Sequence, residues 1–385
     1  MKKISTFVLT SLLFFGMIFL AACNTGGDTA GGGETGGGGS TGGGSGNIDI
    51  GIILPSTDLP RWMQDEQRFL AALEGSGYNV EILFSQDSSS VERQNVETFI
   101  TRGARVIILG SYDGGAAAAA AQAARDAGVY LIAYDRLITG TDAVDFYVTF
   151  DSIAVGEAMG RFLADRASDM GGSGHPLYLF AGHPGDNNAF LFFEGAWNIL
   201  QPRIADGTFV IQNSSAAIAL QDTLNLSRSQ MSDIIQQITT NWLSADARNL
   251  AEANLTAAGA DGKGVAFVLA PNDGTALAIS DAFLADPDIS GLYITGQDAE
   301  VSSVQGIIDG RQSMTVFKDV RMLVSDTVAL ASELLAGGTP QHDGYFYNQF
   351  MDVPSKLSPV IAVDINNLRE ILIYGGYYDE SLFEF

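Results

Sequence analysis

The 385-residue sequence contains few cysteines and few basic residues. The first scarcity excludes an intrachain disulfide, and the second argues against nucleic-acid binding. It has one cysteine, Cys23, so no intrachain disulfide can form. It has 20 basic residues against 45 acidic ones, and the Lys and Arg residues are scattered along the chain. A nucleic-acid-binding surface needs clustered positive charge to displace counterions, so we expect no nucleic-acid partner. The formal net charge of −25 indicates a well-hydrated surface instead.

A long apolar run occurs at the N-terminus, where Lys2 and Lys3 precede FVLTSLLFFGMIFL and the run leads to LAAC. This is the pattern of a secretory signal, and no other stretch is long and apolar enough to span a bilayer. The small residues before Cys23 resemble the lipobox of bacterial lipoproteins, so we expect a lipoprotein signal over 1–23 with Cys23 acylated. The alternative is a plain signal peptide with an incidental cysteine. Residues 24–46 are so rich in glycine that they predict a flexible tether. The sequence therefore predicts an extracytoplasmic protein of the cell envelope, attached to the membrane through a lipid alone.

From residue 47 the sequence alternates strand-like apolar runs with helix-like segments. IDIGIIL, YNVEILF, ARVIILG and VYLIAY are separated by such segments, and the pattern restarts at AVDFYVTF. This alternation predicts an α/β fold with two doubly wound, parallel-sheet lobes in series. Residues 213–242 are less regular and could be a helix or an elaborated loop, which we interpret as an insertion in the second lobe. DGGAAAAAAQAARDAG lacks the Lys-Ser/Thr ending of a phosphate loop, so we predict an Ala-rich helix there.

Polar side chains follow the carboxyl ends of the predicted strands, which is where open parallel sheets bind ligands. These ends carry Asp, Asn, Arg, Lys and Trp, without a Ser–His pair, a His/Cys cluster or a phosphate loop. We therefore expect no catalytic residues, no metal and no cofactor. A pyranose sugar presents hydroxyl groups on its rim and C–H groups on its faces. Carboxylates, amides and cations bind the hydroxyls, and an indole covers a face.

The segment VYLIAYDR raises a local problem, because Asp135 and Arg136 follow a buried strand side by side. Adjacent residues of an extended strand point to opposite sides. For both side chains to reach one ligand the backbone must leave strand geometry, so we predict a turn that starts at Asp135. The alternative is a salt bridge between the lobes.

The ordered motifs RW, AYDR, DFYVTFD, GHPGDNNAF, PND, GQDAEV and MTVFKD resemble the periplasmic binding proteins for D-xylose and for multiple monosaccharides. The resemblance runs from about Ile48 to GGYYDESL. It implies a type I periplasmic binding protein fold, with two lobes joined by three hinge crossovers near 150–151, 312–313 and 350–353. The N-terminal lobe would hold 47–150 and 314–350, and the C-terminal lobe would hold 151–313 and 351–385.

The resemblance also implies the ligand-binding residues. They are Arg61, Trp62, Asp135, Arg136, Asp186, Asn188, Trp242, Asn272, Asp298 and Lys318. Asp186 could in addition cap its helix, since Asp is a favoured N-cap residue. We assign Trp197 to the core, Asp273 to a helix cap and His183 to a structural role.

The resulting prediction is a monomeric monosaccharide-binding protein, for xylose or a glucose-type aldose, that delivers sugar to the permease of an ABC importer by hinge closure. A sensing subunit that presents sugar to a chemoreceptor or sensor kinase is the alternative. An enzyme using Asp135 and Asp298 as paired carboxylates is disfavoured, because both charges are expected to bind hydroxyls and cations. The export signal and the lack of a DNA-binding helix pair argue against a transcription regulator. The residue types do not distinguish one monosaccharide from another.

Overall fold

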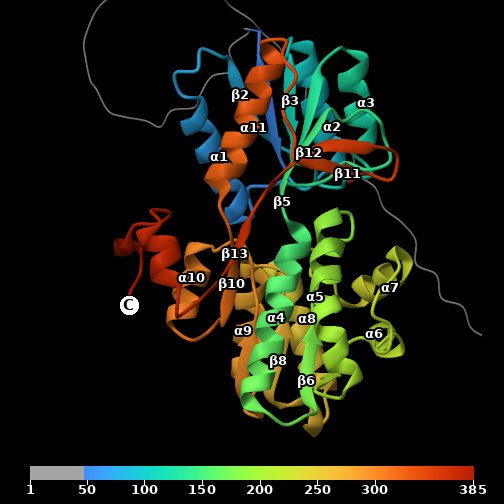
Figure 1. The fold of residues 1–385 in the computed structure, drawn as a ribbon, viewed down its shortest axis with the longest axis vertical. Coiled ribbons are helices and arrows are strands. Elements are labelled where there is room, and N and C mark those ends of the chain that lie inside the picture. Colours follow the sequence, from blue (N-terminus) through green and yellow to red (C-terminus); the bar gives the residue numbers. More distant parts are fainter. Residues whose placement is uncertain (1–46) are drawn as a thin grey trace, which may run out of the picture. The chain divides into compact units, whose positions relative to one another are not determined.

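Two larger β-sheets, one mostly and one wholly parallel, organise residues 47–385, which the computed structural model describes (Figure 1). Cys23 and the predicted signal and tether lie outside the described residues. The described residues belong to one compact unit that spans Ser45–Phe385. The predicted α/β class with parallel sheets is confirmed.

The first sheet has seven strands in the order β11-β12-β5-β4-β3-β1-β2. Their bounds are β1 Ile50–Leu54, β2 Val80–Phe84, β3 Val106–Leu109, β4 Tyr130–Tyr134, β5 Phe146–Phe150, β11 Gly344–Tyr347 and β12 Asp352–Ser358. All neighbours pair in parallel except β11 and β12, which form an antiparallel hairpin at one edge. We call this sheet with its helices the first lobe.

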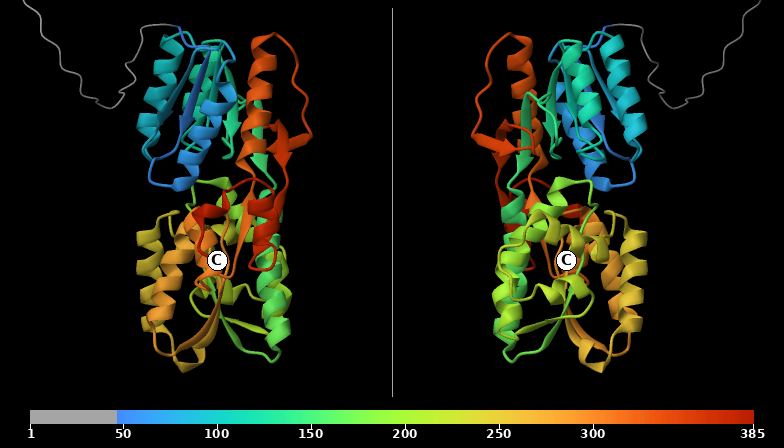
Figure 2. Two further views of the ribbon diagram at one scale, coloured as in Figure 1. Left: turned by 90° about the vertical axis from the view of Figure 1, so that its left-hand side faces the viewer. Right: turned by 90° about the vertical axis from the view of Figure 1, so that its right-hand side faces the viewer.

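Helices cover both faces of the first sheet, as the side views of Figure 2 show. The helices are α1 Pro60–Leu73, α2 Ser89–Thr101, α3 Ala118–Asp126 and α11 Val320–Leu335. Ile107 and Leu109 pack in the cluster with α2 and α3, whereas Val106 and Ile108 pack with α1 and α11. Successive side chains of a strand face opposite ways, so a strand buried on both faces is apolar throughout.

The second lobe contains a four-stranded parallel sheet in the order β7-β6-β8-β9. Its strands are β6 His175–Leu179, β7 Phe209–Ile211, β8 Gly264–Leu269 and β9 Ile289–Ile294. The helices that pack on it or beside it are α4 Ser152–Met170, α5 Asn187–Ala205, α6 Ser215–Ala219, α7 Arg228–Ile238, α8 Ser244–Ala257, α9 Asp273–Ala285 and α10 Val301–Ile308. The irregular stretch 213–242 therefore contains two short helices, α6 and α7. Trp197 lies in the core of this lobe, as predicted, with 2% of its surface exposed.

Two of the three predicted crossovers are at the wrong residues. The chain leaves β5 at Phe150 and enters α4 at Ser152, close to the first predicted position. However, β10 Met314–Lys318 pairs with β13 Val360–Asp364 and bridges to Gln297, so it packs with the second lobe. The second crossover therefore follows Lys318 rather than lying near 312–313. Strand β12 pairs with β5 in the first sheet, so the third crossover follows Ser358 rather than lying near 350–353. Hydrogen-bond partners, which a local pattern does not reveal, decide both positions.

The tail after β13 packs beside α10 and β10 on the second lobe. No helix within residues 47–385 is long and apolar enough to cross a membrane.

Candidate ligand-binding site

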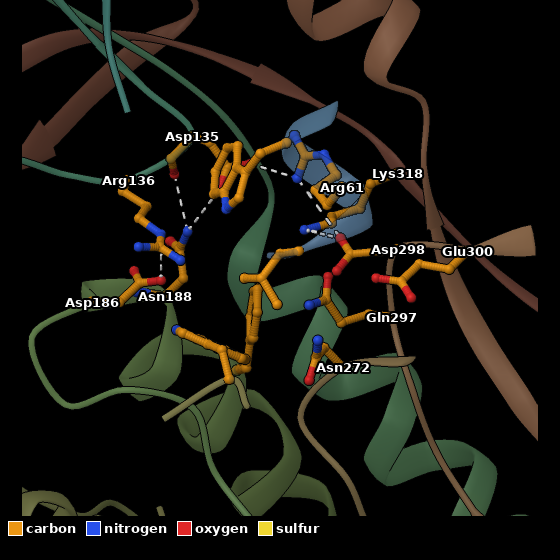
Figure 3. A pocket seen from close by; sticks show the side chains of 14 residues that line it. Arg61, Asp135, Arg136, Asp186, Asn188, Asn272, Gln297, Asp298, Glu300 and Lys318 are labelled. Atoms are coloured by element: carbon orange, nitrogen blue, oxygen red, sulfur yellow. Dashed lines mark hydrogen bonds and ion pairs between the residues drawn. The ribbon is translucent and has the colours of Figure 1, made fainter. Parts of the chain in front are cut away.

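A pocket with about 400 Å³ of space not filled by protein atoms, its mouth included, lies between the two lobes (Figure 3). All ten residues named as ligand-binding from the sequence line it: Arg61, Trp62, Asp135, Arg136, Asp186, Asn188, Trp242, Asn272, Asp298 and Lys318. Four further residues that sequence reasoning missed complete the lining: Leu59, Phe192, Gln297 and Glu300.

Arg61 enters the pocket from the first turn of α1, where Pro60 occupies the first helical position. Its Nε lies 2.7 Å from an oxygen of Asp65, one turn along the helix, and its Nη atoms donate to Asp135 at 3.2 Å. The Tyr134 hydroxyl also donates to Asp65. Charge-assisted hydrogen bonds of this kind are directional, so the two carboxylates fix where the guanidinium points.

The predicted turn at Asp135 is confirmed. Strand β4 ends at Tyr134, and Asp135 has φ +61°, in the left-handed region that Asp tolerates better than most residues. At this turn the buried Asp135 carbonyl oxygen accepts hydrogen bonds from the Tyr147 hydroxyl at 2.9 Å, the Thr149 hydroxyl at 3.0 Å and Asn188 Nδ2 at 2.9 Å. The turn therefore lets Asp135 and Arg136 both line the pocket.

Arg136 connects the first lobe to the start of α5. Its Nε lies 3.0 Å from Asp186 Oδ2, while Asp186 Oδ1 accepts from the Asn188 backbone N–H and so caps α5. Asp186 thus has the predicted capping role and a place in the pocket. The guanidinium groups of Arg136 and Arg61 lie 5.1 and 5.2 Å from the Trp62 ring centroid, within the range of cation–π attraction. These contacts fix the orientation of the indole.

Asp298 and Lys318 line the second-lobe side, with Lys318 at the end of β10 (Figure 3). Lys318 Nζ lies 2.8 Å from Asp298 Oδ1, and Arg61 Nη1 lies 3.7 Å from the same oxygen. Asn272 lies at the N-cap of α9, where its Oδ1 accepts from the Thr275 hydroxyl at 2.6 Å. That bond leaves the amide hydrogens of Asn272 available to a ligand.

Trp242 and Phe192 form an aromatic floor. Their rings meet edge to face, with centroids 6.2 Å apart. Trp242 has φ +65°, which is unusual for a bulky residue, and its indole packs directly on Gly182. Phe192 lies one helical turn after Asn188 on α5, and this i, i+4 spacing is the signal that could have identified it. Gln297 directly precedes the predicted residue Asp298, and Glu300 lies two residues after it.

The carboxyl groups of the site are not equivalent. Burial disfavours the charge of Asp135, but Arg61, Lys318 and Arg136 together outweigh it and lower the pKa of this carboxyl. Burial, reinforced by Asp273 and Asp298, holds the pKa of Glu300 well above its usual range. Glu300 is therefore suited to act as a neutral acid, which can donate a hydrogen bond as well as accept one.

Asp273 is not the helix cap that the sequence predicted. Its carboxylate is fully buried behind the pocket and accepts from Gln312 Nε2 at 2.7 Å, the Glu300 backbone N–H at 2.9 Å and the Thr315 hydroxyl at 3.0 Å. Burial, then the nearby Asp298, raises its pKa to about 8. Asp273 therefore braces the loop that carries Asp298.

His183, beside the pocket, accepts from the Gly185 N–H and lies 3.4 Å from the Tyr112 hydroxyl, contacts that fit a structural role.

The pocket combines fixed charges with polar atoms that lack a protein partner. The indole nitrogens of Trp62 and Trp242 and Oε1 of Gln297 are buried without a hydrogen bond to any described residue. Within residues 47–385, no cluster of His, Cys, Asp and Glu could hold a metal ion. Buried donors and acceptors without partners are costly, so the arrangement favours a ligand that supplies several hydrogen-bonding groups and an apolar face.

Comparison with known proteins is consistent with this geometry. Residues 50–339 match the family model described as a periplasmic binding protein domain. The multiple sugar-binding periplasmic receptor ChvE of Rhizobium radiobacter is 34% identical over 86% of this chain and 90% of its own length. The D-xylose-binding periplasmic protein of Escherichia coli K12 is 29% identical over 87% of this chain and 92% of its own length.

A solved structure is more similar still. A carbohydrate transporter solute-binding protein from Chloroflexus aurantiacus, in complex with D-glucose, is 59% identical with a TM-score of 0.86, covering 88% of this chain and 98% of that one. The chain belongs to the periplasmic binding protein family, and the resemblance found in its motifs is confirmed.

Proposed function

We propose that this protein is an extracytoplasmic sugar-binding protein that holds one aldopyranose, of the D-glucose or D-xylose type, and delivers it to an ABC importer. The names of its relatives support the ligand class and the transport role. The observation that carries the proposal is the pocket itself, where paired charges, amide groups and two indoles whose N–H groups lack a partner among the described residues surround one buried space.

Each part of a pyranose has a matching group in this pocket. The carboxylates of Asp135 and Asp298 accept from ring hydroxyls, while Arg136 and Lys318 donate to them. The indole of Trp62 or Trp242 covers an apolar face of the ring. The two carboxylates are already held by cations at 3.2 and 2.8 Å, which suits binding rather than turnover.

Closure of the lobes is the proposed mechanism. Direct bonds already join the lobes in this structure: Arg136 to Asp186, Asn188 to Asp135, and the Gly114 N–H to the Gly185 carbonyl at 3.0 Å. A sugar that contacts both lobes binds the closed form better than an open one, so it shifts the population towards closure. The closed form would then be the one that a permease recognises.

The remaining parts of the proposal concern location and role. We propose that acylation of Cys23 anchors the protein, which mass spectrometry of the membrane fraction would test against a Cys23→Ala variant. A sensing subunit would use the same pocket. Permease and ATPase genes beside this one would favour import, whereas a receptor or kinase gene would favour sensing.

Titration calorimetry with D-glucose, D-xylose, D-galactose and L-arabinose tests the ligand class, with the open-chain polyol D-mannitol as the control. We expect saturable binding of one pyranose per chain and none of the polyol. Fluorescence should change on binding, because Trp62 and Trp242 line the pocket while Trp197 is buried elsewhere. Absence of heat and of a fluorescence change with every sugar would contradict the proposal.

A further inference from the structure

A second set of contacts joins the lobes outside the pocket, where the C-terminal tail meets α1. The tail, residues 366–385, lies beside α10 and below α1 in Figure 1. Tyr377 and Phe383 share a hydrophobic cluster with Val304 of α10 and Phe317 of β10, so the tail belongs to the second lobe. Gln64 of α1, in the first lobe, reaches across to it.

Both ends of the Gln64 amide are used in this contact. Gln64 Nε2 donates to the Tyr378 hydroxyl at 3.2 Å, and Gln64 Oε1 accepts from the Tyr377 hydroxyl at 3.2 Å. The Tyr378 hydroxyl in turn donates to the Ala299 carbonyl at 2.9 Å. The groups form a connected chain of hydrogen bonds, in which each bond polarises and strengthens the next.

This chain of bonds connects two segments that carry pocket residues. Gln64 lies three residues after Arg61 on α1, and Ala299 lies between Asp298 and Glu300. Asp298 and Ala299 have φ values of +105° and +52°, so their loop needs external bonds to hold its shape. Tyr378 supplies one of these bonds.

Cations of the first lobe add to the contact. Arg68 of α1 and Arg321 of α11 lie 5.5 and 5.0 Å from the centroid of the Tyr377 ring. Arg321 Nη1 also donates to the Gly376 carbonyl at 2.9 Å. The tail is thus held by two helices of the opposite lobe.

We propose that Gln64, Tyr377 and Tyr378 form a clasp between the lobes, which stabilises the closed form and slows sugar release without contacting the sugar. None of the three lines the pocket. Bonds between the lobes favour only the form in which the lobes meet, so the clasp changes the closed population rather than the chemistry of recognition. The inference rests on the proposed sugar-binding function, and its residues are positioning residues.

The variant Gln64→Leu removes both hydrogen bonds of the side-chain amide at nearly constant side-chain volume. Gln67→Leu is the matched control, because Gln67 lies on the same helix and is exposed. Stopped-flow fluorescence measures the association and release of D-glucose and of D-xylose. We expect Gln64→Leu to release sugar about ten-fold faster, with the association rate within about two-fold of wild type, since two neutral hydrogen bonds are lost from the closed form. Gln67→Leu should match wild type.

A second variant separates the clasp from a local packing role. Tyr378→Phe keeps the ring but removes the hydroxyl. In the double variant with Gln64→Leu, the increase in release rate should be smaller than the two single effects combined, because the two residues share a hydrogen bond. Release from Gln64→Leu at the rate of Gln67→Leu would overturn the clasp. A lower melting temperature of sugar-free Gln64→Leu, with an unchanged rate of sugar release, would also overturn the clasp, because Gln64 would then stabilise the fold alone.

Failure of wild type and Gln67→Leu to bind either sugar would instead contradict the proposed function. X-ray scattering of the sugar-free proteins then decides the clasp. A larger radius of gyration for Gln64→Leu than for Gln67→Leu would support it, and equal values would overturn it.

Discussion

The contact between Trp242 and Gly182 allows a steric test of the pocket floor that changes no pocket residue. A Cβ atom added at Gly182 would lie 2.0 Å from Cζ2 of Trp242 and 2.2 Å from Cη2. Carbon atoms in contact are about 3.5–4.0 Å apart, so the indole would have to move by about 1.5 Å (3.5 − 2.0) in Gly182→Ala. Phe192 packs against the same ring, which limits where the indole can go.

We expect Gly182→Ala to raise the Kd for D-glucose about 10- to 100-fold, or about 1.4–2.8 kcal/mol. The loss combines a misplaced apolar contact with overpacking beside the ligand. Calorimetry gives the Kd. Gly259→Ala is the control, because a Cβ there meets no atom within 4 Å, and its affinity should equal that of wild type.

A double-mutant cycle locates the cause. In a Trp242→Ala background the added methyl group displaces no indole, so Gly182→Ala should change the Kd by less than about two-fold. Wild-type affinity in Gly182→Ala, or an equal loss in both backgrounds, would refute the reasoning that Gly182 holds Trp242 in place as the floor of the site.

Three further predictions follow from the contacts. Asp135→Asn removes the charge that pairs with Arg61, and since a charge-assisted bond is worth about 1.5–3 kcal/mol, the Kd should rise about 10- to 150-fold by calorimetry. Asp142 is half exposed in a surface ion pair, so Asp142→Asn should bind sugar like wild type. Equal affinities of Asp135→Asn and Asp142→Asn would contradict the assignment of Asp135 to the binding site. The pKa of Asp273 is raised from 3.8 to about 8, so the folded protein keeps a proton that the unfolded chain loses. The free energy of unfolding should therefore fall as pH rises through this window, by at most about 1.4 kcal/mol per pH unit from this group. Asp273→Asn should flatten the profile in urea unfolding, and an unchanged slope would show that the group is already ionised. Gly156→Ala would place Cβ 2.0 Å from the Phe192 carbonyl oxygen, so α4 and α5 must separate. The free energy of unfolding should fall by about 1–3 kcal/mol, and an unchanged value would argue against their close packing.

The sequence predicts the fold class and much of the pocket for one physical reason. Apolar strands buried on both faces are readable as runs, and the carboxyl ends of parallel strands meet at one edge of each sheet. Residues that directly follow such strands, such as Asp135 after β4 and Lys318 at the end of β10, could therefore be placed near one another before any contact was known. Even the turn at Asp135 follows from the need to turn two adjacent side chains to the same side.

Other parts of the molecule depended on contacts between segments distant in the sequence. The crossovers after Lys318 and Ser358 depend on which strand pairs with which, and β10 reads locally as a strand of either lobe. Phe192 is an apolar residue on an apolar helix, and its place beneath the pocket follows from its contact with Trp242. Asp273 looks like a helix cap until Gln312 and Thr315 are brought to it.

The sequence alone determined the alternation of strands and helices and the chemistry delivered at the strand ends, because both are properties of short segments. Tertiary structure alone decided which groups are paired, which are left without partners and how the lobes are held together. The bond between Gln64 and Tyr378 spans 314 residues of sequence. Neither residue has a local pattern that marks it, since a hydrogen bond between lobes exists only once the whole chain has folded and the lobes have met.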